Sequence, residues 1–289
     1  MDVSIIITSR NTKELLYRCL LSIYESVKTA TFSFEIIVVD NASTDGSTEM
    51  MRSKFPKVIV TKNKTNVGFG KANNQGIIKS KGHFILLLNS DTEVFPEAIS
   101  NLYRFSRSHT NCFVGPKLIN PDRSVQTSCG PFFSLPVVFA ILFLKGDVLG
   151  ITRWSPDRIK KVDWVSGACL MASKKTFLDG LLFDEDIFMY MDEIDLLYRA
   201  RKKGYDVYFY PETRAIHIGS GSSVDKQKSP ILNIYRGLQL FYTKHNPGWQ
   251  MPILKGMLQC KALMGIIIGI LTGNRKLKNI YEEAIRLVQ

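Results

Sequence analysis

Short apolar runs and amphipathic stretches alternate along the first 110 residues of the chain. The runs are aliphatic or β-branched, which is typical of strands buried on both faces of a parallel sheet. They predict strands at residues 3–7, 35–39, 57–60 and 83–88. Between them, apolar residues recur at helical spacing over residues 13–27, 47–54 and 70–80. This order predicts an α/β fold with a mostly parallel central sheet and right-handed crossovers.

The second half of the chain has a less regular pattern. Residues 130–161 are aromatic and interrupted by proline, and they resist assignment. We expect strands at 164–172 and 207–210, the second ending before Pro211, and a helix at 192–203 that stops at Gly204. Residues 219–228 are polar and rich in glycine and serine, which predicts a loop, and the tail from Ile231 is mostly helical.

Polar side chains follow three of the apolar strands at the point where each strand ends. The first strand is followed by residues 8–11, the second by Asp40 and Asn41, and the fourth by residues 89–91. Ligands bind beyond the carboxyl ends of the strands in open α/β sheets, so these groups predict one crevice that holds a polar ligand. For a single position such as Asp91, helix N-capping is an equal alternative.

Composition narrows the class of protein. The chain has 289 residues, 45% of them hydrophobic, and its five cysteines form no C-x-x-C pair. We therefore expect neither a zinc site nor a disulfide framework, and a reducing compartment. The net charge of +12 leaves a basic nucleic-acid-binding module as an alternative. No recognised module signature appears, so we expect no nucleic-acid partner.

Two apolar runs raise the question of a membrane. Residues 135–144 and 262–271 are each shorter than the roughly 20 residues that a bilayer span needs, so we expect no span. The start of the chain also has no signal-peptide pattern. Each run is compatible with a buried helix. The second is equally compatible with an interfacial helix on an anionic membrane, because Lys255, Lys261, Arg275, Lys276, Lys278 and Arg286 surround it.

The Gly68-Phe69-Gly70 segment resembles a dinucleotide fingerprint only superficially. The third glycine is missing, and the first strand–helix turn, where such glycines belong, has none. No G-x-x-x-x-G-K-[ST] segment is present, which disfavours P-loop phosphoryl transfer. A tight turn and a ligand-binding loop remain equal readings of these two glycines.

Seven motifs occur in one order along the chain. Residues 4–11, 38–47, 66–74 and 86–91 closely resemble family 2 glycosyltransferases. Residues 164–168, 188–196 and 217–219 resemble the rhamnosyltransferase branch of that family. The resemblance covers about residues 3–245. It implies a GT-A fold, a nucleotide-sugar donor, a divalent metal and inversion at the anomeric carbon.

The same resemblance implies roles for individual residues, position by position. The donor nucleotide is expected at Thr8, Arg10, Asn11, Asp40, Asn41, Asn66, Gly68, Gly70, Asn73 and Ser90. Asp91 matches the last residue of the family's D-x-D metal motif and His217 a second metal or diphosphate contact, so Mg²⁺ or Mn²⁺ is expected there. Asn89 stands where many members have the first aspartate.

A carboxylate must also accept the proton of the acceptor hydroxyl. Family members commonly have Glu-Asp where this chain has Asp192-Glu193, so position favours Glu193 as the base while residue type keeps Asp192 open. The structural alternative is that both acids only complement the positive end of a helix dipole. Asp195 is expected to bond structural partners or Arg199.

Further roles concern the acceptor side. We expect Trp164 to stack on a sugar, with core packing as its alternative, beside Gly167 in the acceptor region. The basic cluster of Arg199, Arg201, Lys202 and Lys203 is expected to be a solvated helix end, and gripping an acceptor diphosphate is its lesser alternative.

Together these features predict an inverting, metal-dependent glycosyltransferase of bacterial cell-surface polysaccharide synthesis. It would transfer a sugar from dTDP-rhamnose or a UDP-sugar to a glycan or polyprenyl-diphosphate-linked acceptor. Rhamnose is the sugar that we expect. We expect it in the cytoplasm, peripheral at the inner face of the membrane. A sugar-nucleotide nucleotidyltransferase is the enzymatic alternative, although residues 8–13 lack its glycine-rich basic loop.

The expected organisation is a catalytic domain at residues 1–245 and a helical segment at 246–289, with a membrane-associating role considered for the latter. Within the catalytic domain, residues 1–110 form the nucleotide-binding half and residues 111–245 the acceptor half.

Overall fold

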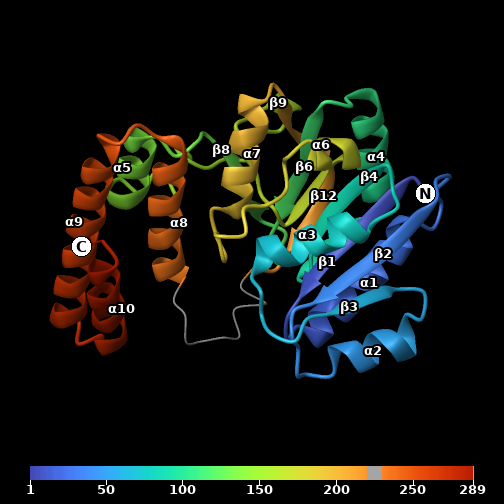
Figure 1. Ribbon diagram of the computed structural model, residues 1–289, viewed down its shortest axis with the longest axis horizontal. Coiled ribbons are helices and arrows are strands. Elements are labelled where there is room, and N and C mark those ends of the chain that lie inside the picture. Colours follow the sequence, from blue (N-terminus) through green and yellow to red (C-terminus); the bar gives the residue numbers. More distant parts are fainter. Residues whose placement is uncertain (220–229, 289) are drawn as a thin grey trace.

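The computed structural model describes residues 1–219 and 230–288, and it has a mixed α/β architecture with a helical C-terminal part (Figure 1). The central sheet has the strand order β3-β2-β1-β4-β11-β6-β12-β5. Its strands are β1 (Val3–Ser9), β2 (Phe34–Asp40), β3 (Ile59–Lys62), β4 (Phe84–Asn89), β5 (Thr92–Val94), β6 (Cys112–Ile119), β11 (Cys169–Ser173) and β12 (Asp206–His217). Strands β3, β2, β1 and β4 run parallel, and β11 joins β4 to β6 in antiparallel pairing.

Short strands complete the β structure. Strand β7 (Val125–Gln126) pairs with β6, and β9 (Lys160–Lys161) pairs with β12. Strands β8 (Cys129–Gly130) and β10 (Trp164–Val165) form a separate two-stranded sheet.

Helices cover both faces of the sheet, as the apolar strands require. These helices are α1 (Lys13–Ser26), α2 (Ser47–Lys54), α3 (Phe69–Lys79), α4 (Ala98–Ser108), α6 (Lys174–Leu178) and α7 (Asp192–Lys202). On β1, Ile5 and Ile7 pack into the core under α1 and α4, whereas Ile6 packs into the core that includes Ile77 of α3. All three isoleucines are 0% exposed, so the strand is buried on both faces.

The predicted elements of the first half are confirmed within one or two residues. Strand β3 differs in its surroundings, because it lies at the edge of the sheet and Ile59 is 44% exposed.

Two predicted strands of the second half were wrong in extent. The strand expected at 164–172 is split, because the chain turns at Ser166 and enters the central sheet only at Cys169. The strand expected to end before Pro211 continues to His217. A register shift between Tyr210 and Arg214 lets β12 pass the proline, which has no N–H to donate. The loop predicted at 219–228 lies, except for Gly219, outside the described residues.

The C-terminal part is formed by helices α8 (Pro230–His245), α9 (Gln250–Leu271) and α10 (Arg275–Arg286). Helix α5 (Leu135–Phe143), from the middle of the chain, packs with them. Helix α9 packs against α5, α8 and α10, beside the sheet rather than on it (Figure 1). Gly265 and Gly269 let α10 approach closely, since a Cβ at Gly265 would lie 2.2 Å from the Tyr281 ring. The helical tail is thus confirmed, and α5 belongs to the same group.

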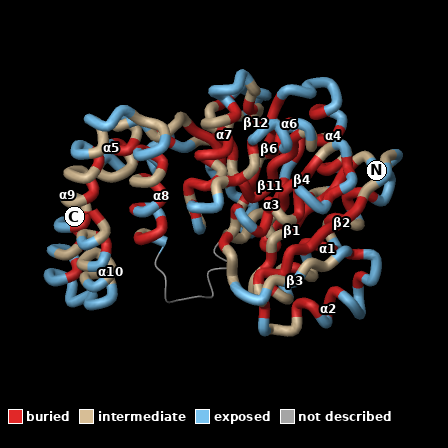
Figure 2. The backbone as a smooth tube through the Cα atoms, viewed as in Figure 1, coloured by how far each residue is buried: buried red, intermediate tan, exposed pale blue. Residues whose placement is uncertain are grey.

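The expectation that the tail is too short for a membrane span was wrong about its length. The apolar run at 262–271 is the second half of a 22-residue helix, α9, whose most apolar 18 residues have a mean hydropathy of 1.6. By length and composition alone this helix could cross a bilayer. Only 28% of its apolar window is buried, and Figure 2 shows exposed and intermediate positions along much of α9 and α10.

Candidate active site

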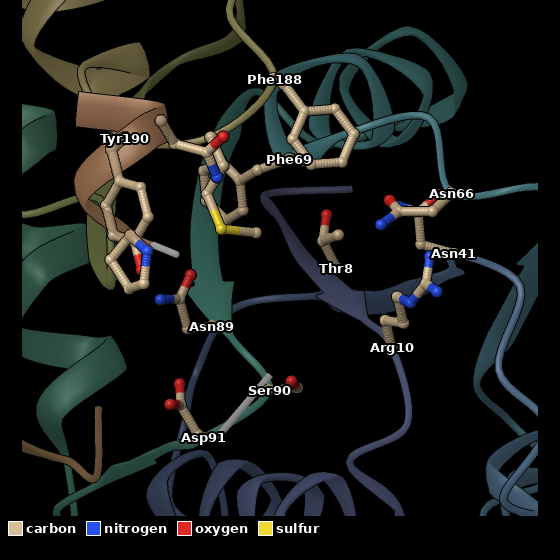
Figure 3. Close-up of a pocket in the computed structure, with 13 residues that line it drawn as sticks. Thr8, Arg10, Asn41, Asn66, Phe69, Asn89, Ser90, Asp91, Phe188 and Tyr190 are labelled. Carbon is tan, nitrogen blue, oxygen red and sulfur yellow. The ribbon is translucent and has the colours of Figure 1, made fainter. Parts of the chain in front are cut away.

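A pocket lies beyond the carboxyl ends of β1, β2 and β4, where the sequence predicts a crevice (Figure 3). Arg10, Asn41 and Asn66 stand on one side of it, and Asn89 and Asp91 stand on another. The full lining is Thr8, Arg10, Asn41, Asn66, Phe69, Asn89, Ser90, Asp91, Phe188, Met189, Tyr190, Pro230 and Asn233. Strand ends far apart in the sequence therefore meet at one polar cavity.

Asn41 organises the donor side of this pocket. Its amide nitrogen donates to Asn66 Oδ1 at 2.7 Å and to the Gly68 carbonyl at 3.2 Å. Its own Oδ1 accepts the backbone N–H of Val67 at 3.0 Å and the amide of Asn63 at 3.2 Å. These four bonds fix the loop after β3 against the end of β2, so Asn41 and Asn66 are presented to a ligand in a defined orientation.

Asp40 and Asn11, both expected to contact the nucleotide, support this wall and do not line the pocket. Asp40 is 0% exposed, and its carboxylate accepts the Ser43 N–H at 3.0 Å and the Thr48 hydroxyl at 2.7 Å. Asn11 has a left-handed φ of 50° and accepts the Thr44 N–H at 2.8 Å. Both side chains hold the turn before α2 through these hydrogen bonds.

Gly68 and Gly70 also act on the chain itself. A Cβ at Gly68, where φ is +91°, would lie 2.9 Å from the Phe188 carbonyl, and one at Gly70 would lie 2.9 Å from Phe183 Cβ. Asn73 donates to the Phe69 carbonyl at 3.1 Å and likewise does not line the pocket. The missing side chains of the two glycines thus let the Phe183–Phe188 segment pack closely against the start of α3. The Phe69 N–H donates to the Phe188 carbonyl at 3.1 Å, and both phenylalanines line the pocket (Figure 3).

Asp91 and His217 come together as the resemblance implies. His217 Nε2 lies 3.5 Å from Asp91 Oδ1 and 3.5 Å from the amide nitrogen of Asn89. Gln126 donates its amide to the His217 and Asn120 carbonyl oxygens, so its Oε1, 2.8 Å from His217 Nδ1, acts as the acceptor. This assigns the proton to Nδ1 and turns the lone pair of Nε2 toward Asp91.

Few side chains near Asp91 could coordinate a metal ion. Residues 1–219 and 230–288 contain no cluster of three or more His, Cys, Asp or Glu side chains arranged for a metal. The Oδ1 atom of Asn89 is buried and accepts no hydrogen bond within those ranges. An amide oxygen, a carboxylate and an imidazole nitrogen together suit a divalent cation such as Mn²⁺ or Mg²⁺.

Strained backbone precedes the two candidate bases. Tyr190 and Met191 both adopt left-handed φ values, 65° and 66°, which non-glycine residues rarely do and which cluster at functional sites. Helix α7 then begins with Asp192 and Glu193. Burial, then the charge of Glu193 and the hydrogen bond between the two carboxyl groups, raise the pKa of Asp192 well above its usual value. Asp192 thus tends to hold a proton, while Glu193 is only partly buried.

Asp195 has the structural role expected of it. Its buried carboxylate accepts Arg199 Nε at 2.8 Å and lies 2.6 Å from His245 Nε2 of α8. Burial opposes ionisation, but the His245 hydrogen bond and the Arg199 charge outweigh it and lower the pKa of Asp195. This pair locks α8 to α7 one turn after the candidate bases.

Comparison with known proteins relates the first part of the chain to a family. Residues 4–128 match the family "Glycosyl transferase family 2". The chain carries a glycosyltransferase family 2 domain. The chain is 26% identical over 241 residues to an N-acetylglucosaminyl-diphospho-decaprenol L-rhamnosyltransferase of Mycobacterium tuberculosis, covering 74% of this chain and 76% of the relative. It is 27% identical over 221 residues to the low-salt glycan biosynthesis hexosyltransferase Agl10 of Haloferax volcanii, covering 75% and 67%.

Solved structures agree on the fold of the family 2 domain. GalNAc-T7, crystallised with UDP, GalNAc and Mn²⁺, superposes with a TM-score of 0.61 at 17% identity, over 84% of this chain and 50% of that one. S. aureus TarS 1-349 in complex with UDP-GlcNAc superposes with a TM-score of 0.57 at 16% identity, over 100% and 93%. The fold is GT-A, and the protein is a glycosyltransferase.

The residues expected on the acceptor side of the site lie differently from expectation. Trp164 is 2% exposed and donates its indole N–H to the Pro131 carbonyl at 2.9 Å, so it belongs to the core and cannot stack on a sugar. Gly167 lies beside Glu193, since a Cβ there would be 3.3 Å from Glu193 Cβ. The Ser166–Gly167 turn therefore packs on the candidate base.

The basic end of α7 is engaged in the fold. Arg199 pairs with Asp195, Arg201 with Asp206, and Lys203 with Asp179. Sequence reasoning also missed Pro230 and Asn233 of α8 as pocket residues. No local signal marks them, because α8 reaches the pocket only through the packing of the C-terminal helices.

Proposed function

We propose that this glycosyltransferase is an inverting, metal-dependent enzyme that transfers a sugar, first of all rhamnose, from a nucleoside diphosphate to a lipid-linked acceptor. The observation that carries the proposal is the pocket, which joins the nucleotide-side residues of β1 and β2 to the Asn89–Asp91–His217 cluster. The relative named as acting on N-acetylglucosaminyl-diphospho-decaprenol supports the choice of sugar and acceptor.

The donor nucleotide would lie against Thr8, Arg10, Asn41 and Asn66. The Thr8 hydroxyl lines the pocket and is buried without a hydrogen-bond partner in the described chain, so a ligand would satisfy it. Thymine and uracil present the same hydrogen-bonding edge, so these contacts do not distinguish dTDP-rhamnose from a UDP-sugar. Asp40, Asn11, Gly68, Gly70 and Asn73 would act by shaping the loops that carry these contacts.

Asp91, His217 Nε2 and Asn89 Oδ1 would hold Mg²⁺ or Mn²⁺. The imidazole nitrogen favours Mn²⁺, since Mg²⁺ prefers oxygen ligands throughout. When bound, the cation offsets the negative charge that develops on the departing diphosphate. Gln126 would keep the His217 ring in the tautomer that presents a lone pair.

Glu193 would act as the general base. The acceptor oxygen forms its bond to the anomeric carbon as the bond from that carbon to the diphosphate oxygen breaks, and the hydroxyl proton passes to the Glu193 carboxylate. One displacement of this kind inverts the anomeric carbon. Glu193 suits the task better than Asp192, which is 4% exposed and shares a hydrogen bond with its neighbour.

The C-terminal helices would place the enzyme at the inner face of the cytoplasmic membrane. Large apolar side chains of α9 are exposed, among them Ile267 at 54%, Ile270 at 60% and Leu271 at 80%. Val148 and Leu149, in the turn that follows α5, are 77% and 66% exposed. Apolar side chains with flanking Arg275, Lys276 and Lys278 suit an anionic bilayer surface.

The experiment that tests the function is a transfer assay with a panel of nucleoside diphosphate sugars, Mn²⁺ and a short-chain lipid diphospho-N-acetylglucosamine acceptor. Transfer should require the cation and fall to background in EDTA, and the product should have the anomeric configuration opposite to that of the donor. Full turnover in EDTA or retention of configuration would overturn the proposed mechanism.

A further inference from the structure

A second groove adjoins the donor pocket, between the segment after α6 and helix α8. It shares Phe188, Met189 and Asn233 with the donor pocket and continues along Ile187, Arg236 and Leu240. Two cavities with a common wall suit two substrates that must meet. Phe188 and Met189 lie directly before the strained Tyr190–Met191 turn and the candidate bases, and Asn233 lies on α8.

Charge in this groove is not balanced internally. Asp186 also lines it, but its carboxylate is 2.8 Å from Lys244 Nζ, and Asp184 lies 2.5 Å from the same ammonium group. Arg236 is exposed, and no ion pair within residues 1–219 and 230–288 includes it. A guanidinium without a carboxylate partner, at the rim of a cavity, is suited to a phosphate-bearing ligand.

Apart from Asp186, Asn233 and Arg236, the side chains that line the groove are apolar: Ile187, Phe188, Met189 and Leu240. Helix α8 is held firmly against this segment, because a Cβ at Gly237 would lie 2.9 Å from Met191 Cγ and His245 bonds Asp195. The groove thus places the Arg236 guanidinium beside an apolar wall. Such a combination matches a diphosphate joined to a hydrocarbon chain.

We propose that Arg236 binds the diphosphate of a lipid-linked acceptor, whose first isoprenoid unit lies along Ile187 and Leu240. The inference rests on the proposed function, because it assigns the acceptor subsite of the same reaction. In such an acceptor the reacting hydroxyl and the diphosphate are at opposite ends of one sugar. The Arg236 guanidinium, in the cavity next to the donor pocket, therefore holds the acceptor where its hydroxyl can face Glu193.

The basic end of α7 does not serve this purpose, since Arg199, Arg201 and Lys203 each have a carboxylate partner. Arg236 comes from α8 and escapes notice in the sequence, because a lone arginine on an amphipathic helix has no motif around it.

The test measures binding of farnesyl diphosphate, farnesol and inorganic pyrophosphate to the full chain by titration calorimetry. The variants are Arg236→Gln, Arg236→Lys and, as the matched loss of one exposed helical arginine, Arg52→Gln on α2. Arg236→Gln should weaken farnesyl diphosphate roughly 10- to 100-fold, as expected for a lost charged hydrogen bond, and leave farnesol unchanged. Arg236→Lys should lose less, and Arg52→Gln should match the wild type.

Equal farnesyl diphosphate affinity in Arg236→Gln and the wild type would overturn the assignment. So would pyrophosphate binding as tightly as farnesyl diphosphate, which indicates a free-phosphate site. If Arg236→Gln lost binding to phosphatidylglycerol vesicles but kept its affinity for farnesyl diphosphate, Arg236 would be a lipid headgroup site, and the assignment would again be overturned. The donor nucleotide is titrated into the same samples: if the wild type binds none, the proposed function fails, and if donor binding is intact, only the acceptor subsite is at stake.

Discussion

Strands β1 and β4 of the sheet and helix α9 are all rich in apolar residues, but the strands are buried and much of α9 is exposed. Ile5 of β1 and Leu86 of β4 are 0% exposed, because helices cover both faces of the sheet. On α9, Ile267 and Ile270 are 54% and 60% exposed, and only the side that faces α5, α8 and α10 is covered. The strands that carry the site are therefore buried by the chain's own helices, whereas one face of α9 is left exposed.

This contrast separates what the protein does within itself from what it needs from outside. Burial of apolar surface stabilises the sheet, and the sheet in turn fixes the loops that carry the donor pocket. The exposed face of α9 contributes nothing comparable to folding, and contiguous exposed apolar surface marks an interaction site. Changes in the first region should alter chemistry or stability, and changes in the second should alter membrane binding alone.

The largest effect is expected at the candidate base. Glu193→Gln should lower the transfer rate about 10³-fold, because the amide keeps the shape but cannot accept the acceptor proton. Donor affinity and vesicle binding should stay within about twofold of the wild type. Asp192→Asn is the matched control and should lower the rate only about tenfold. An inactive Asp192→Asn beside an active Glu193→Gln would move the base to Asp192.

Alanine substitutions test the contrast in stability directly. Leu87→Ala, in a strand where this side chain is 1% exposed, should lower the free energy of unfolding by about 2–5 kcal/mol. Ile267→Ala, at a position that is 54% exposed, should change it by no more than about 0.5 kcal/mol. Urea unfolding of both variants measures the difference. Similar losses in the two would show that the exposed face of α9 is part of the folding core.

The membrane face should respond to polar substitution. Replacing Ile267, Ile270 and Leu271 with serine should weaken binding to phosphatidylglycerol vesicles roughly 30-fold, since about 2 kcal/mol of apolar contact is lost. Leu21→Ser on α1, a side chain that is 47% exposed, is the control and should have no effect. Sedimentation at low and high salt measures both. Unchanged binding of the triple variant would assign this face to a different partner.

The smallest effect concerns Asp192 and pH. Burial and then the charge of Glu193 raise the pKa of Asp192, so the folded chain holds this proton more tightly than the unfolded chain. The resulting stabilisation is present below the unfolded-state pKa of about 4 and is lost as the pH rises through the folded-state value. Asp192→Asn should therefore gain stability relative to the wild type as the pH rises. A pH-independent difference in urea unfolding would contradict the raised pKa.

The parallel sheet was predictable because its strands are buried on both faces and their pattern is local. The crevice followed from the strand ends, and the pocket does bring Thr8, Asn41 and Asp91 together. Which of the polar side chains line the pocket was not predictable, because it depends on the partners that the folded loops provide to Asp40 and Asn11. Trp164 likewise became a core residue through its contact with Pro131, a residue more than thirty positions away.

The long-range parts of the site depend on packing that leaves no sequence signal. Asn233 and Arg236 reach the site because Gly237 lets α8 approach Met191 and because His245 bonds Asp195. Helix α9 shows the same limit, since its apolar run gives no hint of how much α5 and α10 would cover. Local pattern thus specifies elements, and tertiary contact decides which faces meet a ligand.

Binding of a nucleoside diphosphate sugar through a cation held at Asp91 is the property on which the proposed function depends. Its most direct test is calorimetric titration of dTDP-rhamnose and UDP-N-acetylglucosamine into the full chain, with Mn²⁺ and with EDTA, for the wild type and Asp91→Ala. We predict that one of these donors binds the wild type at least tenfold more tightly with Mn²⁺ and that Asp91→Ala abolishes the cation's contribution while remaining folded. Donor binding that is equal with Mn²⁺ and EDTA, or unchanged in Asp91→Ala, would contradict the claim.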